Sequence, residues 1–378
     1  MGEHYLDNSA TTRVLPEAAE EALRLMTECY GNPSSLHTMG FRAKKALDSA
    51  RETIGRRLGA LPEEIVFTGG GTEANNLAIL GAARAKKRMG QHIVTTMTEH
   101  DSVLNTMKQL ESEGFRVTYL APGTDGNIDP AELEVAIGPD TVLVSMMLCN
   151  NETGTILPVQ AAARAIKRKK SPALLHTDCV QAFCKLDFTV KGLGADLCTV
   201  SGHKVHAPKG VGALYVKKGV RLLPIVHGGG QERGLRSGTE SLPLIGAFAK
   251  AVELAPKGAG ALEKIGGLRE LLLSDLAELP RVEVNSSGNG LPYIVNLSAL
   301  GVRAETMLHF LAERGVYVSA GSACGKAKPS HVLEAMGLPR ERVSSALRVS
   351  FSRFSTEEDV YALIEGLRAG LSSLEKER

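Results

Sequence analysis

Short apolar runs alternate with amphipathic stretches over the first two thirds of the chain. The amphipathic stretches at 72–89, 101–113 and 158–170 repeat their apolar positions with the spacing of a helix. The apolar runs are rich in β-branched residues and predict strands at 64–68, 92–96, 115–120, 141–147, 173–177 and 195–200. Strands that alternate with helices are typical of a parallel sheet with crossover helices, so this part of the chain is predicted to be α/β.

The pattern changes after the Pro- and Gly-containing stretch at 256–260. Strand-like segments VEVNS, YIVNLS, VYVSA and ALRVSF then alternate with helical segments at 259–279, 303–314 and 355–375. This pattern indicates an α+β domain that is hinged at that stretch. We therefore predict a large domain at 14–256 and a small domain made of 1–13 and 257–378.

Composition narrows the class of protein. The 378 residues are 43% apolar, enough for more than one core, and the net charge of +2 does not favour binding to nucleic acid or to a membrane. Six cysteines occur without a CxxC pair or Cys/His spacing, which argues against a metal site or a disulfide scaffold and favours a reducing compartment. Without a signal-peptide pattern or an apolar run long enough to span a membrane, we expect a cytoplasmic protein with a small-molecule partner.

The first candidate for chemistry is the turn GGGTEANN after strand 64–68. Gly69 to Gly71 allow the backbone to approach a ligand closely, and Thr72 opens the next helix, whose free N–H groups suit a phosphate. The turn also fits the G-x-G-x-x-A pattern of dinucleotide-binding proteins, with Glu99 as the acid for the ribose. This turn alone leaves both cofactor classes open.

Three further segments follow predicted strands. In HTDCVQ, the carboxylate of Asp178 can keep a ring nitrogen protonated while Gln181 reaches a ring oxygen. In VSGHKVH, Lys204 lies in a basic loop that lowers the pKa of an amine, as formation of a Schiff base requires. His100, in TEH, can stack on a cofactor ring or move protons. With the glycine turn, these residues indicate pyridoxal 5'-phosphate rather than a nicotinamide, because a dehydrogenase has no use for the lysine.

Cys324 is the candidate nucleophile. It lies in GSACGKAKPSH among small residues, and Lys326, Lys328 and His331 are close enough in sequence to favour the thiolate. Most cysteines outside such a setting behave as small hydrophobes, and Cys179 is interpreted as a packing residue of this kind.

In order along the chain, eleven motifs resemble those of the cysteine desulfurase family. They extend from about residue 5 to 360 and are YLDNSATT, YGNPSSLH, GGGTEANN, TEH, NNETG, HTDCVQ, SGHK, PKGVGALYV, HGGGQERGLRSGT, GSAC and RVSFSRF. Several are shared with other class V aminotransferase relatives, whereas the ordered set with GSAC is specific to desulfurases of the type that feeds iron–sulfur cluster assembly.

The resemblance implies a fold-type-I pyridoxal-phosphate enzyme with a mostly parallel seven-stranded sheet flanked by helices, and a homodimer with its sites at the subunit interface. Lys204 is expected to bind the cofactor covalently. The other expected cofactor contacts are Gly71, Thr72, His100, Asp178, Gln181, Ser201, His203 and, from the partner subunit, Thr239. Substrate L-cysteine is expected to bind through Asn151 and Arg348, whose guanidinium fits a carboxylate.

The resemblance also implies the reaction. Cys324, on a loop of the small domain, is expected to receive the substrate sulfur as a persulfide, while the rest of the substrate leaves as L-alanine. The sulfur then passes to an acceptor protein for the synthesis of iron–sulfur clusters, other sulfur-containing cofactors or modified tRNA. The segment GKAKPSH after Cys324 is shorter than is typical of the family, so the acceptor is left open.

Other interpretations stay open from the sequence. A selenocysteine lyase or another class V transferase keeps the same cofactor, although a transaminase does not need Cys324. A dinucleotide oxidoreductase is allowed by the glycine turn alone. A sulfur-relay scaffold without turnover requires a damaged site, whereas all the expected residues are present.

Overall fold

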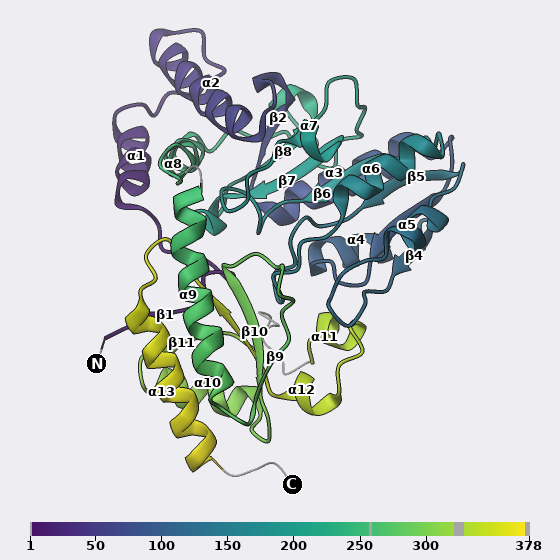
Figure 1. Ribbon diagram of the computed structural model, residues 1–378. Coiled ribbons are helices and arrows are strands. Elements are labelled where there is room, and N and C mark those ends of the chain that lie inside the picture. Colours follow the sequence, from purple (N-terminus) through teal and green to yellow (C-terminus); the bar gives the residue numbers. More distant parts are fainter. Residues whose placement is uncertain (1, 257–258, 321–328, 375–378) are drawn as a thin grey trace.

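The computed structural model describes residues 2–256, 259–320 and 329–374, and the largest sheet in these ranges has seven strands (Figure 1). The strands of this sheet are β2 (Ile65–Thr68), β3 (His92–Thr96), β4 (Arg116–Leu120), β5 (Thr141–Ser145), β6 (Leu174–Asp178), β7 (Leu197–Ser201) and β8 (Gly212–Val216). The six strands predicted from the apolar runs are confirmed, with ends that differ by at most two residues. The apolar pattern does not predict β8, because its run GALYV begins with Gly and Ala, which are poor strand formers.

The topology brings several strand ends to one edge of the sheet. The strand order is β2-β8-β7-β6-β5-β3-β4, in which β8 is antiparallel to both of its neighbours and the other neighbouring pairs are parallel. The predicted mostly parallel sheet is therefore confirmed. Because neighbouring parallel strands end at the same edge, the segments after β3, β5, β6 and β7 meet there, where sheets of this kind bind ligands.

Helices cover both faces of the large sheet. Side chains alternate between the faces along each strand, so Leu143 packs in one cluster with α3 and α4, and Val144 packs in another with α6. The helices are α1 (Pro16–Thr27), α2 (Thr38–Leu58), α3 (Gly71–Lys86), α4 (Asp101–Ser112), α5 (Pro130–Ala136), α6 (Val159–Arg168), α7 (Val190–Leu193), α8 (Leu242–Glu253), α9 (Ala259–Ala277), α10 (Ala304–Ala312), α11 (His331–Ala335), α12 (Arg340–Ser344) and α13 (Glu357–Ser373). In the described part of the chain, none is long and apolar enough to cross a membrane.

A second group of strands and helices is formed mainly by the last third of the chain. Three antiparallel strands, β9 (Val282–Val284), β10 (Ile294–Ala299) and β12 (Ala346–Ser350), pair in the order β12-β10-β9. At the other end of the chain, β1 (His4–Tyr5) pairs in parallel with β11 (Val316–Tyr317). The predicted α+β pattern is confirmed, although the strand predicted from VYVSA is only two residues long.

The first residues of the chain join the two groups. Asp7 forms a β-bridge with Ser350, and Asn8 Nδ2 donates to Ser350 O at 2.9 Å, which fixes the segment to β12. Farther along the same segment, Thr12 N donates to His203 O at 2.9 Å, next to the end of β7. Residues 7–12 therefore lie between the small sheet and the carboxyl edge of the large one.

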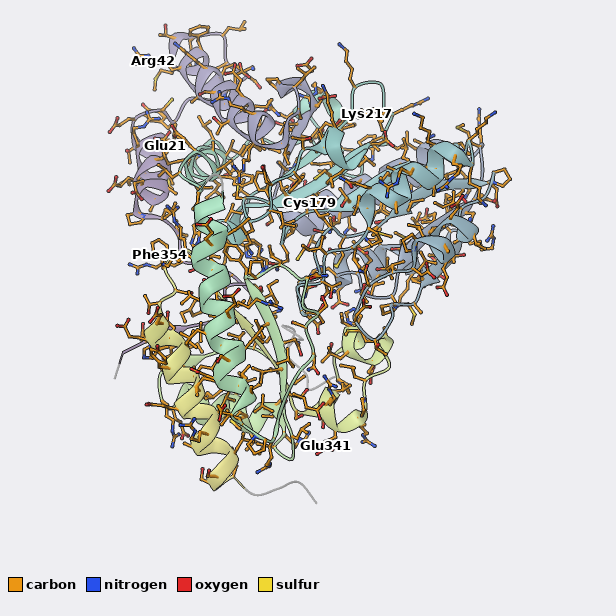
Figure 2. All side chains as sticks on the ribbon, viewed as in Figure 1. Glu21, Arg42, Cys179, Lys217, Glu341 and Phe354 are labelled. Carbon is orange, nitrogen blue, oxygen red and sulfur yellow. The ribbon has the colours of Figure 1, made fainter. Side chains whose placement is uncertain are left out.

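The central strands of the large sheet are buried, and charged side chains such as Arg42 lie on the surface. Strands β5 to β8 are buried along their whole length, as continuous apolar runs predict. Figure 2 shows Cys179 inside the molecule, whereas Arg42, Lys217 and Glu341 point outward. Cys179 has no exposed surface, as its interpretation as a packing residue predicts.

The close approach of β8 to the glycine turn gives a first prediction. A Cβ atom on Gly212 would lie 2.7 Å from the backbone carbon of Gly70, which no side-chain rotation can relieve. We expect Gly212→Ala to lower the free energy of unfolding by about 1–3 kcal/mol and to displace the turn. Denaturant unfolding measures the first effect. Gly267→Ala, on the exposed face of α9 with nothing within 4 Å, is the control and should be neutral or stabilising. Equal stability of Gly212→Ala and wild type would contradict the prediction.

Candidate active site

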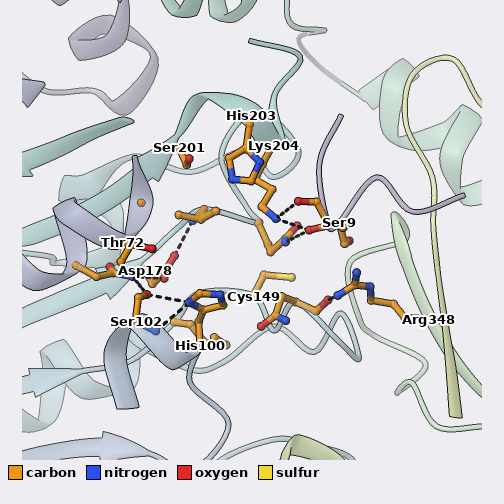
Figure 3. A pocket seen from close by; sticks show the side chains of 17 residues that line it. Ser9, Thr72, His100, Ser102, Cys149, Asp178, Ser201, His203, Lys204 and Arg348 are labelled. Carbon is orange, nitrogen blue, oxygen red and sulfur yellow. Dashed lines mark hydrogen bonds between the residues drawn. The ribbon is translucent and has the colours of Figure 1, made fainter. Parts of the chain in front are cut away.

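A cavity of about 280 Å³ lies at the carboxyl edge of the large sheet (Figure 3). Its lining includes most of the predicted site residues, namely Gly71, Thr72, His100, Asn151, Asp178, Gln181, Ser201, His203, Lys204 and Arg348. The structure therefore brings together residues that are up to 277 positions apart in the sequence. Of the remaining predicted residues, Thr239 is exposed and does not line this cavity, and Cys324 lies outside the described residues.

One wall of the cavity is the turn between β2 and α3. Gly70 has φ of 153°, a value that L side chains rarely adopt, and this turn sends the chain directly into the helix. A Cβ on Gly71 would lie 3.0 Å from Val180 Cγ2 and 3.4 Å from Ser201 Cβ, so only glycine leaves this space open. Ser201 Oγ is buried and has no hydrogen-bond partner within the described residues. The wall thus offers the N–H groups at the start of a helix and a free hydroxyl to an anion.

Asp178 is held at the end of β6 by two donors. Asn75 Nδ2 donates to Asp178 Oδ2 at 2.7 Å, and Val180 N donates to Oδ1 at 2.9 Å. The side chain is almost buried, with 6% of its residue surface exposed. A carboxylate that is fixed in this way at the cavity wall suits a partner that carries a proton, such as a ring nitrogen.

The same asparagine orients His100. The second Asn75 Nδ2 hydrogen reaches Ser102 Oγ at 2.9 Å, so that this hydroxyl donates to His100 Nδ1 at 2.8 Å. Ser102 N also points at Nδ1, at 3.1 Å, and the ring caps helix α4. Nδ1 is therefore an acceptor, and a neutral His100 ring carries its proton on Nε2.

Lys204 reaches the cavity from the short helical turn that follows β7. Its Nζ donates to the carbonyl oxygens of Ser9 and of Ala10, the latter at 2.7 Å (Figure 3). Burial lowers the pKa of Lys204 to about 7, and the positive charges of Arg348 and Lys185 contribute further. Close to half of this amine is thus neutral at neutral pH, which is the form that attacks a carbonyl carbon.

Gln181 and His203 complete the surroundings of Lys204. Gln181 Nε2 donates to Ser9 O at 3.0 Å, and its Oε1 accepts from Lys185 Nζ at 3.1 Å. Burial, with a smaller effect of neighbouring Lys204, lowers the pKa of His203 to about 4. His203 is therefore a neutral ring at pH 7, able to donate one hydrogen bond to an anion without adding a charge.

Arg348 enters the cavity from β12, on the opposite side from the large sheet. Only 1% of this residue is exposed; Nη2 donates to Asp7 Oδ1 at 2.9 Å and Nη1 donates to Asn151 O at 3.1 Å. Its Nε has no partner within the described part of the chain. A buried guanidinium with a donor left over is suited to bind a small carboxylate.

The residues fit pyridoxal 5'-phosphate. The helix start with its unpaired Ser201 hydroxyl suits the phosphate, Asp178 suits the ring nitrogen, and the half-neutral Lys204 suits the aldehyde carbon. The space that a Cβ on Gly71 would fill stays open between these groups. A dinucleotide site would need Glu99 to contact a ribose. Glu99 is instead buried and does not line the cavity, and its Oε1 accepts hydrogen bonds from Met147 N and Thr96 Oγ1.

Four contributions to the site were not predicted from the sequence. Asn75 connects Asp178 to His100, and the carbonyls of Ser9 and Ala10 hold Lys204. Asp7 pairs with Arg348, and Cys149 lines the cavity as a thiol whose pKa burial raises to about 12. The motifs GGGTEANN and YLDNSATT contain three of these contributions, but a motif alone does not indicate which atoms point inward.

The double role of Asn75 gives the second prediction. We expect Asn75→Ala to weaken pyridoxal-phosphate binding roughly 10- to 150-fold, because a hydrogen bond to a charged group contributes roughly 1.5–3 kcal/mol. Titration of the apoprotein with cofactor, followed by visible absorbance, gives the dissociation constant. The matched control is Asn76→Ala, since Asn76 Nδ2 contacts the backbone of α3 on the exposed side. Equal affinities of the two variants would contradict the role assigned to Asn75.

The lowered pKa of Lys204 gives the third prediction. Only the neutral amine reacts, so the rate at which apoprotein captures pyridoxal phosphate should rise about tenfold per pH unit below pH 7 and level off above it. An ordinary lysine, with a pKa of about 10.4, would give a rate that still rises at pH 9. Stopped-flow absorbance over this pH range distinguishes the two profiles, with Lys204→Ala as the control for non-covalent binding.

Comparison with known proteins agrees with this geometry. A family model described as Aminotransferase class-V matches residues 4–363. A protein named cysteine desulfurase IscS from Clostridium botulinum is 44% identical, with 96% of this chain and 93% of that protein covered. A cysteine desulfurase from a Nostoc species is also 44% identical, with 96% and 91% covered.

Solved structures give the same result. A structure titled NifS-like protein has a TM-score of 0.94 and 39% identity and covers 99% of this chain and 100% of its own. A second, titled SspA in complex with cysteine, has a TM-score of 0.83 and 37% identity, with 93% and 100% covered. With the family model matched over nearly its whole length, the chain belongs to the class V aminotransferase family of pyridoxal-phosphate enzymes, and within that family to the cysteine desulfurases.

Proposed function

We propose that this protein is a cysteine desulfurase that converts L-cysteine to L-alanine and transfers the sulfur to Cys324 as a persulfide. The observation that carries the proposal is the shared cavity of a half-neutral lysine, Lys204, and a buried arginine with a free donor, Arg348. The lysine suits a cofactor aldehyde, and the arginine suits the carboxylate of an amino acid.

The ends of the segment that contains Cys324 support its proposed role. Before it, Ser319 exchanges two backbone hydrogen bonds with Arg348. After it, Ser330 Oγ donates to Glu152 in the NNETG turn, and His331 Nε2 lies 3.0 Å from Glu99 O, beside His100. The described residues on both sides of Cys324 are therefore held near the cavity, which favours delivery of this thiol to the substrate.

The cofactor, when bound, supplies an electron sink that stabilises negative charge at the substrate Cα. Lys204, once its amine is free, is placed to take the proton from Cα. Arg348 orients the substrate through its carboxylate, and Asn151 lies beside it at the cavity wall. Asp178 keeps the ring nitrogen protonated, and the Nε2 proton of His100 is available for transfer within the cavity.

Cys324 takes the sulfur by a nucleophilic attack. Its thiolate attacks the substrate sulfur, so that an S–S bond forms and the Cβ–S bond breaks, and the electron pair of the broken bond stays with the carbon fragment. Two protons, one on Cβ and one on Cα, then complete L-alanine. Cys324 keeps the sulfur as a persulfide for an acceptor protein, in the synthesis of iron–sulfur clusters, other sulfur-containing cofactors or modified tRNA.

The proposed assembly is a homodimer in which Thr239 reaches the phosphate of the partner subunit. Two features support it: Thr239 is exposed in its own chain, and large apolar side chains are exposed around α1 and α2, including Leu36, Tyr30 and Phe41. We also propose the two domains predicted above: a large domain at 14–256, and a small domain made of 1–13 and 257–378. The cytoplasmic location stays a prediction.

The fourth prediction tests the reaction. Wild-type protein given L-cysteine and a reductant should form alanine and sulfide in equal amounts, and Cys324→Ser should lose at least about 99% of both products while it still binds the cofactor. Alanine is measured by chromatography and sulfide by a colorimetric assay. Cys29→Ser, at the end of α1 and away from the cavity, is the control for loss of a thiol.

The possible outcomes separate the alternatives. Turnover of selenocysteine without turnover of cysteine would favour a selenocysteine lyase. Full activity of Cys324→Ser would contradict the proposed role of Cys324 as the nucleophile but would leave the proposed role of the cofactor intact. A cofactor-loaded wild type that forms neither product from cysteine would contradict the proposed substrate.

A further inference from the structure

Lys185 is a half-buried cation behind the active site that the proposed mechanism does not use. It lies one turn after Gln181, in the segment that follows β6, and its ammonium lies 5.7 Å from the ring centre of Tyr293. Within the described residues, Lys185 forms no ion pair with a carboxylate. This half-buried ammonium therefore has a neutral amide oxygen and an aromatic ring as partners, neither of which cancels its charge.

Hydrogen bonds connect Lys185 to Lys204 through one amide and one carbonyl. Lys185 Nζ donates to Gln181 Oε1 at 3.1 Å, and Gln181 Nε2 donates to Ser9 O at 3.0 Å. The same Ser9 carbonyl accepts from Lys204 Nζ. An ammonium can only donate and a carbonyl can only accept, so Lys185 and Ser9 together fix the orientation of the amide: the oxygen turns to Lys185 and the nitrogen turns to Ser9.

Lys185 also contributes to the charge around Lys204. Both side chains line a second cavity, of about 30 Å³, which shares Lys204 with the cofactor cavity. The charged groups that face Lys204 from the surrounding elements are Arg348 on β12, Lys185 after β6, Asp7 in the N-terminal segment and Asp178 at the end of β6. The two cations lower the pKa of Lys204 and the two carboxylates raise it.

Burial has the largest effect on Lys185 itself. It lowers the pKa of Lys185 to about 8, which keeps most of this ammonium charged at pH 7. The thiols of Cys149 and Cys184, whose own pKa values burial raises to about 12 and about 11, are neutral at that pH and do not offset the charge. The positive charge of Lys185 therefore acts on the site without compensation from these neighbours.

We propose that Lys185 is a positioning residue of the active site, which turns the amide nitrogen of Gln181 toward the ring oxygen of the cofactor and places a positive charge behind Lys204. A fixed N–H donor stabilises negative charge on that oxygen, whereas a flipped amide would present an oxygen to it. The positive charge opposes protonation of the nitrogen that joins Lys204 to the cofactor. This inference rests on one part of the proposed function, the binding of pyridoxal phosphate at Lys204, and does not depend on the substrate.

Titration of the visible absorbance of the cofactor-loaded protein against pH tests the proposal without turnover. We expect the midpoint in Lys185→Met to lie roughly one pH unit above that of the wild type, because one positive charge near the titrating nitrogen is removed. Lys185→Gln should shift the midpoint in the same direction. Lys185→Arg keeps the charge and a donor and should restore most of the wild-type value.

Lys87→Met is the matched control. The ammonium of Lys87 also lies over an aromatic ring, 5.4 Å from the centre of Phe115, but on the surface and away from the cavity. The titration midpoint of Lys87→Met should equal that of the wild type. A midpoint unchanged in both Lys185→Met and Lys185→Gln, in proteins that melt and bind cofactor like the wild type, would overturn the proposal. Alanine formation from cysteine plays no part in this readout, so a failed desulfurase assay and a failed Lys185 test are separate results.

Discussion

The active site depends on an amine that is buried against backbone carbonyls rather than against a carboxylate. Lys204 Nζ donates to Ser9 O and Ala10 O, and although Asp7 and Asp178 are close enough to act on its charge, neither forms an ion pair with it. A direct carboxylate partner would stabilise the ammonium and raise the pKa of Lys204. Two neutral acceptors position the nitrogen and leave burial and the nearby cations to lower the pKa of Lys204.

This arrangement explains why the first residues of the chain must lie between the two groups of strands. The carbonyls that hold Lys204 come from positions 9 and 10, and the segment is fixed at one end by Ser350 and at the other by His203. Asp7, in the same segment, pairs with Arg348. One short segment thus connects the amine at the large sheet with the arginine at the small sheet, so a shift of β12 would move both the carboxylate-binding group and the acceptors of Lys204.

The elements that could be predicted from the sequence are those with strong periodicity. Six strands of the large sheet and helices such as α3 and α4 follow from apolar spacing, and the position of Asp178 after β6 follows from the rule that ligands bind at the carboxyl edge. The strand β8 could not be predicted, because Gly212 is present for its close approach to Gly70 rather than for strand propensity. Asn75 and the carbonyls of Ser9 and Ala10 could not be predicted because their roles depend on contacts across more than 100 residues of sequence.

The thiol inside the cavity indicates why the sulfur acceptor is expected elsewhere. Cys149 lines the cavity, but burial raises its pKa to about 12, so at pH 7 it is a neutral thiol. Its Sγ also donates to Gly154 O at 3.5 Å, a bond that the thiolate cannot make. The environment that lowers the pKa of Lys204 is the same one that raises the pKa of a thiol, since burial disfavours both charged forms. A site built to keep a lysine neutral therefore cannot also keep its own wall cysteine ionised. This favours the proposed nucleophile Cys324, which lies in the sequence between Ser319 and Ser330, two residues that are held near the cavity.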